Sequence, residues 1–255
     1  MVGIEVFRDY FKDFHDCYIV IGGVACEDHF QGEELPFRAT KDIDLILVVE
    51  ALNNDFIVRF WEFIKDGKYQ EKQIGEGEKQ YYRFIKPETE NFPMQMELFS
   101  RTPDVIERTD DMELTPIPAD EELSSLSAIL MDDEYYDFTI KHSEKGTTIH
   151  RADDLALICL KAKAFLDLTK RKEDGEEVVD SKNIKKHKND VFRLAATLRE
   201  DDKVELPEGI KNDLEEFVKL MTEAKPDVKA IMKTMGITAV TATDLLEQIK
   251  NNFKL

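Results

Sequence analysis

The sequence predicts an α/β protein in two parts, a core of strands and helices over residues 1–150 and a helical half over residues 151–255. Short β-branched or alternating runs, which are typical of strands, occur near 17–21, 42–49 and 92–100. From residue 151 onward the apolar residues repeat with a helical period over 152–172, 183–200, 208–223 and 241–253. A chain of 255 residues can also bury a sizeable core.

The first strands are expected between helices. Residues 1–17 carry aromatic side chains on one side of an amphipathic helix, and the apolar run up to Ile21 predicts a strand. A second helix is expected from Gly23. The next strand, at 42–49, is apolar on both faces in its second half, which is typical of a strand in the middle of a sheet.

The rest of the core combines one helix with hairpins. Residues 53–67 predict a helix with Asn53 or Asn54 as N-cap and Gly67 as its stop. Residues 68–87 predict a hairpin that turns at Gly75 and Gly77, and residues 92–100 a further strand. Residues 103–126 carry prolines and predict irregular structure, and residues 127–142 predict a second hairpin around Asp132-Asp133.

The charge is strongly acidic overall but unevenly distributed. A formal net charge of -19 argues against sequence-independent nucleic-acid binding, which relies on Lys and Arg. Residues 141–200 nevertheless hold 14 Lys and Arg against 11 Asp and Glu. Within them the run SKNIKKHK precedes Asp190 and is either a solvated helix face or a rim that faces phosphate or RNA.

The cysteines and the hydropathy predict a cytoplasmic protein. Cys17, Cys26 and Cys159 are far apart and lack metal-ligand spacing, which suits a reducing compartment. No run of eighteen apolar residues predicts a membrane span, and the N-terminal segment lacks the apolar core of a signal peptide.

Two acids stand at the start of the 42–49 strand. Side chains alternate along a strand, so Asp42 and Asp44 point to the same side, roughly 7 Å apart along the chain. Two carboxylates so placed can share one hard cation, and Mg²⁺ favours one or two carboxylates together with substrate phosphates. The alternative is that both acids lie in solvent where a loop becomes a strand.

A glycine pair lies upstream of these acids. Gly22 and Gly23 follow the 17–21 strand and open a helix, which allows backbone N–H groups to approach a phosphate. The alternative is an ordinary tight turn.

Together these residues resemble a known family. Gly22-Gly23 followed by FRATKDIDLIL resembles the signature of the polymerase-beta-like nucleotidyltransferase superfamily. The spacing of Arg38, Thr40, Asp42 and Asp44 is similar to that of the AbiEii-like abortive-infection toxins. The resemblance implies a nucleotidyltransferase core in which Mg²⁺ or Mn²⁺ assists transfer of a nucleoside monophosphate from an NTP to a hydroxyl of RNA, such as tRNA, or of protein. It also implies a toxin role with an antitoxin as partner.

The resemblance implies further site residues. Glu97, on the alternating strand FPMQMELFS, would be the third metal-binding and catalytic acid beside Asp42 and Asp44. An acid, Asp153 or Asp154, would precede a family lysine, for which Lys161 and Lys163 compete.

Other implied roles fall on the helical half and on the glycine pair. Asp190 would act as a base or hold the family lysine, although Lys186-His187 departs from the usual Arg-Asp or Lys-Asp pair. The nucleotide would contact the glycines, Arg38, Thr40 and the two candidate lysines. These residues are Gly22, Gly23, Arg38, Thr40, Lys161 and Lys163.

Two alternatives stay open at this point. The chain could keep the fold as an inactive nucleotide-binding or protein-interaction module, or it could transfer a nucleotide to a small molecule such as an antibiotic. In each case the helical half, residues 151–255, is expected to complete a cleft with the core.

Overall fold

The computed structural model describes the chain except for residues 1–2, 75–79, 101–128, 130–131 and 176–178. In the described part, one mixed sheet has the strand order β3-β4-β5-β2-β1-β7-β6. β2 is parallel to β5 and antiparallel to β1, and β1 is parallel to β7. The strands are β1 (Tyr18–Ile21), β2 (Asp42–Leu47), β3 (Gln70–Ile74), β4 (Gln80–Ile85), β5 (Gln95–Ser100), β6 (Ser143–Lys145) and β7 (His150–Ala152).

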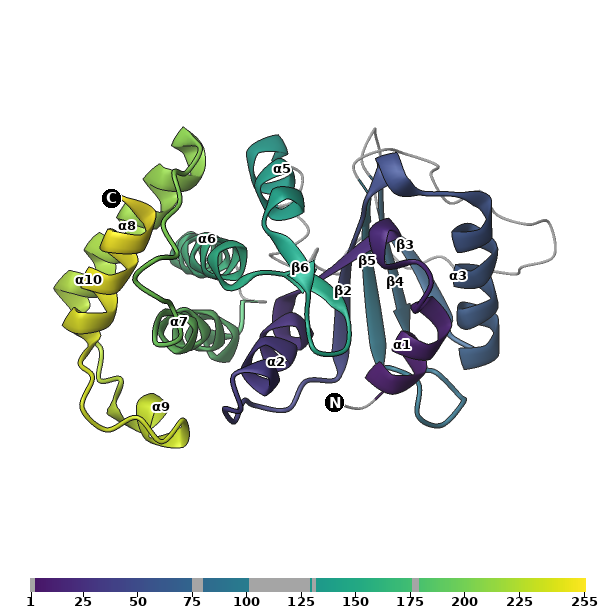
Figure 1. Ribbon diagram of the computed structural model, residues 1–255, viewed down its shortest axis with the longest axis horizontal. Helices are drawn as coiled ribbons and strands as arrows, with labels where there is room; N and C mark the ends of the chain where they lie inside the picture. The colour runs from purple at the N-terminus through teal and green to yellow at the C-terminus, as the bar shows by residue number, and fades with distance from the viewer. Residues whose placement is uncertain (1–2, 75–79, 101–128, 130–131, 176–178) are drawn as a thin grey trace.

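Helices cover both faces of this sheet (Figure 1). The first helix α1 (Ile4–Phe11) and α3 (Asn54–Gly67) lie on one side, and α2 (Gly22–Gly32) lies on the other. Aromatic rings fill the space beneath α1 and α3, with the Phe7 and Phe11 centroids 4.7 Å apart and Phe63 edge-on to Phe7. The predicted α/β core with helices flanking a mixed sheet is therefore confirmed.

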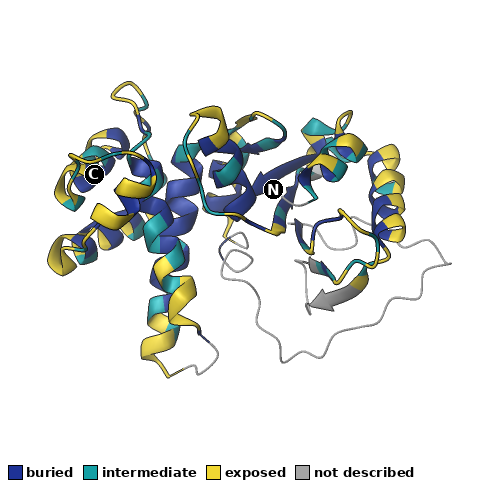
Figure 2. Cartoon of the chain, turned by 90° about the horizontal axis from the view of Figure 1, so that it is seen from below, coloured by how far each residue is buried: buried dark blue, intermediate teal, exposed yellow. Residues whose placement is uncertain are grey.

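The helix α5 (Asp133–Lys141) precedes β6 and β7, and the helical half follows them. Its helices are α6 (Asp154–Glu173), α7 (Ser181–Ala195), α8 (Glu208–Ala224), α9 (Lys229–Thr234) and α10 (Ala242–Phe253). α6 is its central element: it packs against α2, α7 and α8, and every residue from Leu155 to Leu166 is buried except Lys163. Figure 2 shows that the buried residues continue from the central strands into these helices. The division of the chain at residue 150 stays a prediction.

Several boundaries follow their predicted signals. The Asn53 side chain accepts a hydrogen bond from the Phe56 N–H at 2.9 Å, so Asn53 is the N-cap of α3 as expected, and α3 ends at Gly67. β1 and α2 meet at the glycine pair, and β5 contains Glu97.

Other predictions were wrong or lie outside the described residues. The hairpin expected around Asp132-Asp133 is the start of α5, because the Asp132 carboxylate accepts the N–H groups of Glu134 and Tyr135 and caps a helix. The short helix α9 was not predicted, and α7 ends at Ala195 rather than near residue 200. The turn at Gly75 and Gly77 and the segment 103–126 lie outside the described residues. None of the described helices has the length and apolar character that crossing a membrane requires.

Candidate functional site

Three acidic side chains lie on adjacent parallel strands. The register of β2 and β5 pairs Asp44 with Glu97 and Asp42 with Gln95. Residues in register on neighbouring strands point to the same face, and Asp42 and Asp44 share a face because they are two positions apart. The structure thus brings the three predicted acids to one region of the sheet.

The carboxylates of β2 are poorly compensated. Burial raises the pKa of Asp44 to about 8, with Glu97 and Asp42 raising it further and Lys161 and Lys186 opposing the rise. Burial also raises the pKa of Asp42. Among the described residues, no hydrogen bond or ion pair reaches the carboxylate of Asp44. Asp44 is half-buried and Asp42 is exposed at the start of β2. A half-buried carboxylate without a partner is costly, so Asp44 in particular favours a bound cation.

Glu97, by contrast, is already engaged. Its Oε1 atom accepts hydrogen bonds from Nε and Nη2 of Arg83, both at 2.9 Å, and from Nε2 of Gln95 at 2.8 Å. Arg83 reaches it because the antiparallel register of β4 and β5 sets the two residues opposite each other. In this arrangement no three His, Cys, Asp or Glu side chains of the described residues are grouped closely enough to hold a metal ion. Arg83 and Gln95 thus hold Oε1 of Glu97, and Arg83 competes with a metal ion for this carboxylate.

The glycine pair makes room for the acids. Gly22 has φ +71°, and a Cβ there would lie 2.0 Å from Oδ2 of Asp44. A Cβ on Gly23 would lie 2.7 Å from Cγ2 of Thr40 and 3.3 Å from Nη2 of Arg38. The pair therefore has a packing reason to be glycine, independent of any phosphate: a side chain at either position would displace Asp44 or the loop before it.

Thr40 anchors this loop rather than facing open space. Its hydroxyl donates to Oε2 of Glu27 at 2.7 Å, and its backbone N–H donates to the same oxygen at 3.2 Å. Glu27 lies on α2, so the contact fixes the loop before β2 against the helix that opens with the glycine pair.

Asp190 is the centre of a buried cluster of cations. Its carboxylate is fully buried. It accepts hydrogen bonds from Arg38 Nη2 at 2.9 Å and from Arg193 Nη1 at 3.1 Å, and Lys161 Nζ lies 3.6 Å from it. Burial alone would raise the pKa of Asp190, but Lys161, Arg38 and Arg193 hold it below its ordinary value. A carboxylate so stabilised is a weak base, and the contacts fit the predicted alternative that Asp190 holds the lysine.

The two candidate lysines point in different directions. Lys161 is only 1% exposed and lies beside Asp190. Lys163 binds Asp213 of α8 at 2.9 Å and lies 3.5 Å from Asp167. The structure brings Lys161 to the acids and places Lys163 at the contact between α6 and α8. Asp153 caps α6 through the Ala156 N–H and contacts His142, and so lies outside the cluster.

Sequence reasoning missed Arg83 as a partner of Glu97, and it placed Lys186 and His187 only in the basic run before Asp190, with no role beside the acids. Lys186 is among the cations that act on Asp42 and Asp44, and burial together with Lys161 and Arg38 lowers its own pKa. It stands four residues before Asp190 on α7, so the i,i+4 spacing was a readable signal. No sequence signal would have paired Arg83 with Glu97.

Two buried polar atoms near this cluster have no partner among the described residues. They are Nε of Arg38 and Nδ1 of His187. Burial and the neighbouring Lys161 and Lys186 hold the pKa of His187 well below its ordinary value, so its imidazole is neutral. Buried polar atoms are normally hydrogen-bonded, so each of these two donors or acceptors is left to be satisfied by water or a ligand.

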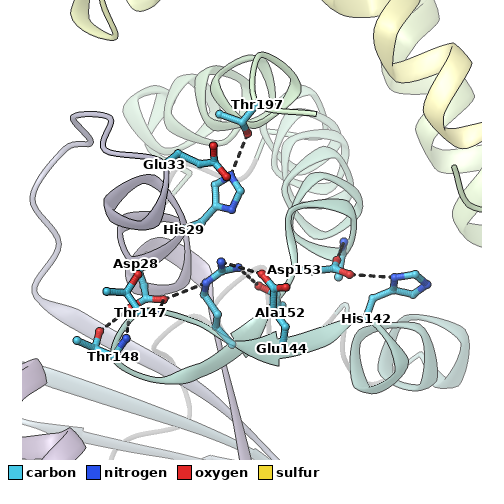
Figure 3. A network of polar contacts seen from close by, with 12 residues as sticks. Asp28, His29, Glu33, His142, Glu144, Thr147, Thr148, Ala152, Asp153 and Thr197 are labelled. Atoms are coloured by element: carbon cyan, nitrogen blue, oxygen red, sulfur yellow. Dashed lines mark hydrogen bonds and ion pairs between the residues drawn. The ribbon is translucent and has the colours of Figure 1, made fainter. Parts of the chain in front are cut away.

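A second polar network fixes the other end of α2 (Figure 3). The buried Asp28 accepts the N–H groups of Thr147 and Thr148, at 2.8 and 2.9 Å, and Nε of Arg151 at 3.0 Å. His29 contacts the hydroxyl of Thr197 just beyond α7, at 2.9 Å. α2 is thereby attached to the β6–β7 hairpin and to the end of α7, which holds the glycine pair in place.

Comparisons with known proteins add no assignment. No family model, curated protein or solved structure matches this chain. Beyond the fold, the function therefore has to be argued from the site itself.

Proposed function

We propose that the chain is a metal-dependent nucleotidyltransferase that transfers a nucleoside monophosphate from an NTP to an acceptor hydroxyl of RNA or protein. The observation that carries the proposal is the pair Asp42 and Asp44, which share one face of β2, have no ion pair among the described residues and lie near Lys161 and Lys186. Carboxylates without an ion-pair partner can bind a metal ion, and the neighbouring lysines can bind phosphate. Together they suit a substrate in which a metal ion accompanies a triphosphate. The resemblance of the glycine pair and the Arg38–Asp44 segment to polymerase-beta-like enzymes supports the same reaction.

The donor set fits a hard divalent ion. Asp42 and Asp44 would hold Mg²⁺ or Mn²⁺, and Glu97 would join them if its contact with Arg83 were broken. When bound, the ion would neutralise charge on the phosphate oxygens. The raised pKa of Asp44 has the direction expected of a carboxylate that is completed by a cation.

The chain's own cations would orient the triphosphate. Lys161, held by Asp190, and Lys186 supply positive charge next to the acids, and Arg38 has an Nε donor with no partner among the described residues. In the transfer the acceptor oxygen bonds to the α-phosphorus and the bond from that phosphorus to the β-phosphate bridging oxygen breaks, which releases pyrophosphate. Asp44 and Glu97 are the candidates to accept the hydroxyl proton.

The test compares two double variants. Wild-type protein, Asp42→Asn/Asp44→Asn and the surface control Asp13→Asn/Asp201→Asn are incubated with each labelled NTP, Mg²⁺ or Mn²⁺, and RNA and protein fractions. Asp13 and Asp201 are exposed, so the control removes the same charge elsewhere. We expect label transfer and pyrophosphate release by wild type and control only. Equal labelling by the Asp42/Asp44 variant would contradict the proposal.

One observation favours a second candidate, a nucleotide-binding module without turnover. Arg83 holds Oε1 of Glu97, the acid that would complete the metal site. Calorimetry separates the two candidates: metal-dependent NTP binding without pyrophosphate release in the presence of any acceptor fraction indicates the module. A toxin role rests on the resemblance alone, and induced expression with growth as readout tests it.

A further inference from the structure

A pocket of about 360 Å³ lies between α7 and the segment that leads into α9. This volume is within the range of small-molecule sites. Its two walls differ in character: α7 contributes Phe192 but otherwise the polar or cationic residues Lys185, Lys188, Asn189 and Arg193, whereas the other segment contributes mostly apolar side chains such as Val228 and Ile231. In Figure 1, α9 stands apart from the other helices below α7, with extended chain on either side.

The α7 wall carries positive charge that the described residues do not neutralise. Neither Lys185 nor Lys188 has an ion pair in the part of the chain that the structure describes. Partial burial and the charge of Lys185 lower the pKa of Lys188. The one acid in the pocket, Asp227, accepts the Lys229 N–H at 2.9 Å at the start of α9. In a protein of net charge -19, this local excess of positive charge favours an anionic ligand.

Arg193 links the pocket to the Asp190 cluster. Arg193 lines the pocket, and its Nη1 atom contacts Asp190 Oδ1 at 3.1 Å. Asp190 in turn holds Lys161 and Arg38. A ligand in the pocket is therefore separated from the candidate site by one side chain on the same helix.

We propose that this pocket binds a nucleotide unit, with its phosphate against Lys185 and Lys188 and its base or sugar against Val228 and Ile231. A cationic wall facing an apolar wall matches a ligand with a charged and a flat apolar part. The unit is either a free nucleotide or one residue of a nucleic-acid strand. The choice of a nucleotide rests on the proposed nucleotidyl transfer at the neighbouring site, whereas the preference for an anion rests on the pocket alone.

The experiment measures binding in EDTA, so that the metal-dependent site does not contribute. A labelled single-stranded RNA 12-mer is titrated by fluorescence anisotropy, and AMP and inorganic phosphate by calorimetry. Lys185→Gln/Lys188→Gln is compared with Lys170→Gln/Lys219→Gln, which removes two exposed lysines from α6 and α8. Thermal melts of both variants check that they are folded.

We expect the Lys185/Lys188 variant to bind the RNA or AMP about tenfold more weakly, and the control to bind like wild type. If the unit belongs to a strand, the RNA is the ligand, and the slope of log K against log salt falls in magnitude by about 1.4 for the two lost contacts. If it is a free nucleotide, AMP binding is the one that weakens. Equal binding by both variants would contradict the proposed ligand site in the pocket. Inorganic phosphate that binds as tightly as AMP and the RNA would contradict the choice of a nucleotide as the ligand.

The two proposals fail separately. Asp44→Asn is expected to lose metal-dependent NTP binding while it keeps binding in EDTA. If no NTP is turned over by wild type but the Lys185/Lys188 effect remains, the transferase proposal fails and the pocket stands as an anionic nucleotide site. If turnover occurs and neither variant changes ligand binding, the pocket proposal fails alone.

Discussion

Two charge clusters share Lys161 and Arg38 as neighbours, yet they are balanced in opposite ways. Asp190 is one carboxylate among three cations, and its pKa is lowered. Asp42 and Asp44 are two carboxylates with raised pKa values and no ion pair in the described part of the chain. The carboxylate of the first cluster is fully paired without a ligand, whereas the two carboxylates of the second would be completed by a cation. This difference distinguishes a cluster that positions the chain's own cations from one that is suited to bind a metal ion.

Removing the centre of the complete cluster should have the largest effect. Asp190→Asn leaves Lys161 buried among other cations, and breaking such a pair costs about 3–5 kcal/mol of unfolding free energy. Urea unfolding at pH 7 measures it. The pKa of Asp190 is lowered in the folded state, so its contribution is present above the ordinary carboxyl pKa and is lost as the pH falls through the folded value.

A second substitution sharpens this result. Lys161→Met in the Asp190→Asn background removes one uncompensated charge and should recover part of the loss, because the two residues interact. If Asp190→Asn lowered the unfolding free energy by less than about 1 kcal/mol, water rather than the neighbouring cations would be stabilising the carboxylate of Asp190.

The contact between Arg83 and Glu97 gives the next largest effect. Arg83→Met removes hydrogen bonds to a carboxylate that is 3% exposed and should cost about 2–3 kcal/mol without metal. Because Glu97 is then available to the pair on β2, Mn²⁺ should bind more tightly and return part of the stability. Melting curves with and without Mn²⁺ measure both effects. A variant that Mn²⁺ stabilises no more than wild type would show that Glu97 is not a ligand.

These cases also show what the sequence could predict. The two-residue period placed Asp42 and Asp44 on one face, the family resemblance implied Glu97 as the third acid, and the cap of α3 was readable at Asn53. Asp132-Asp133 was misread because acids that favour turns are also good N-caps.

The remaining contacts depend on tertiary packing. Lys161 and Lys163 could not be told apart because α6 is apolar on almost every side, so its pattern does not indicate which face meets α7. Arg83 meets Glu97 through a register between strands that the composition of neither strand specifies.

Neutralising Asp44 should stabilise the metal-free protein. Its folded pKa, about 8, lies above the value in the unfolded chain, so the unfolded state ionises first and the wild type loses stability as the pH rises from about 4 to 8. Asp44→Asn removes this loss and should be more stable by about 1–2 kcal/mol at pH 8. Unfolding at pH 5 and pH 8 tests the trend. A variant less stable than wild type at pH 8 would mean that Asp44 is compensated.

The smallest effect separates burial from cation binding. Burial also raises the pKa of Asp154, to about 7, with Asp153, Asp202 and Glu144 raising it further. Asp154→Asn should therefore stabilise the protein by about 1 kcal/mol above pH 7, through the same linkage as at Asp44. Mn²⁺ should cancel the pH-dependent loss that arises from Asp44, which has Asp42 on the same strand and Glu97 opposite. It should leave the loss from Asp154 unchanged, because the acids near Asp154 already have partners: Asp153 contacts His142, Glu144 pairs with Arg151, and Asp202 accepts the Arg199 N–H. If Mn²⁺ acts equally on both, a raised carboxylate pKa in this chain reports burial alone, and the contrast between the two charge clusters no longer supports a metal site.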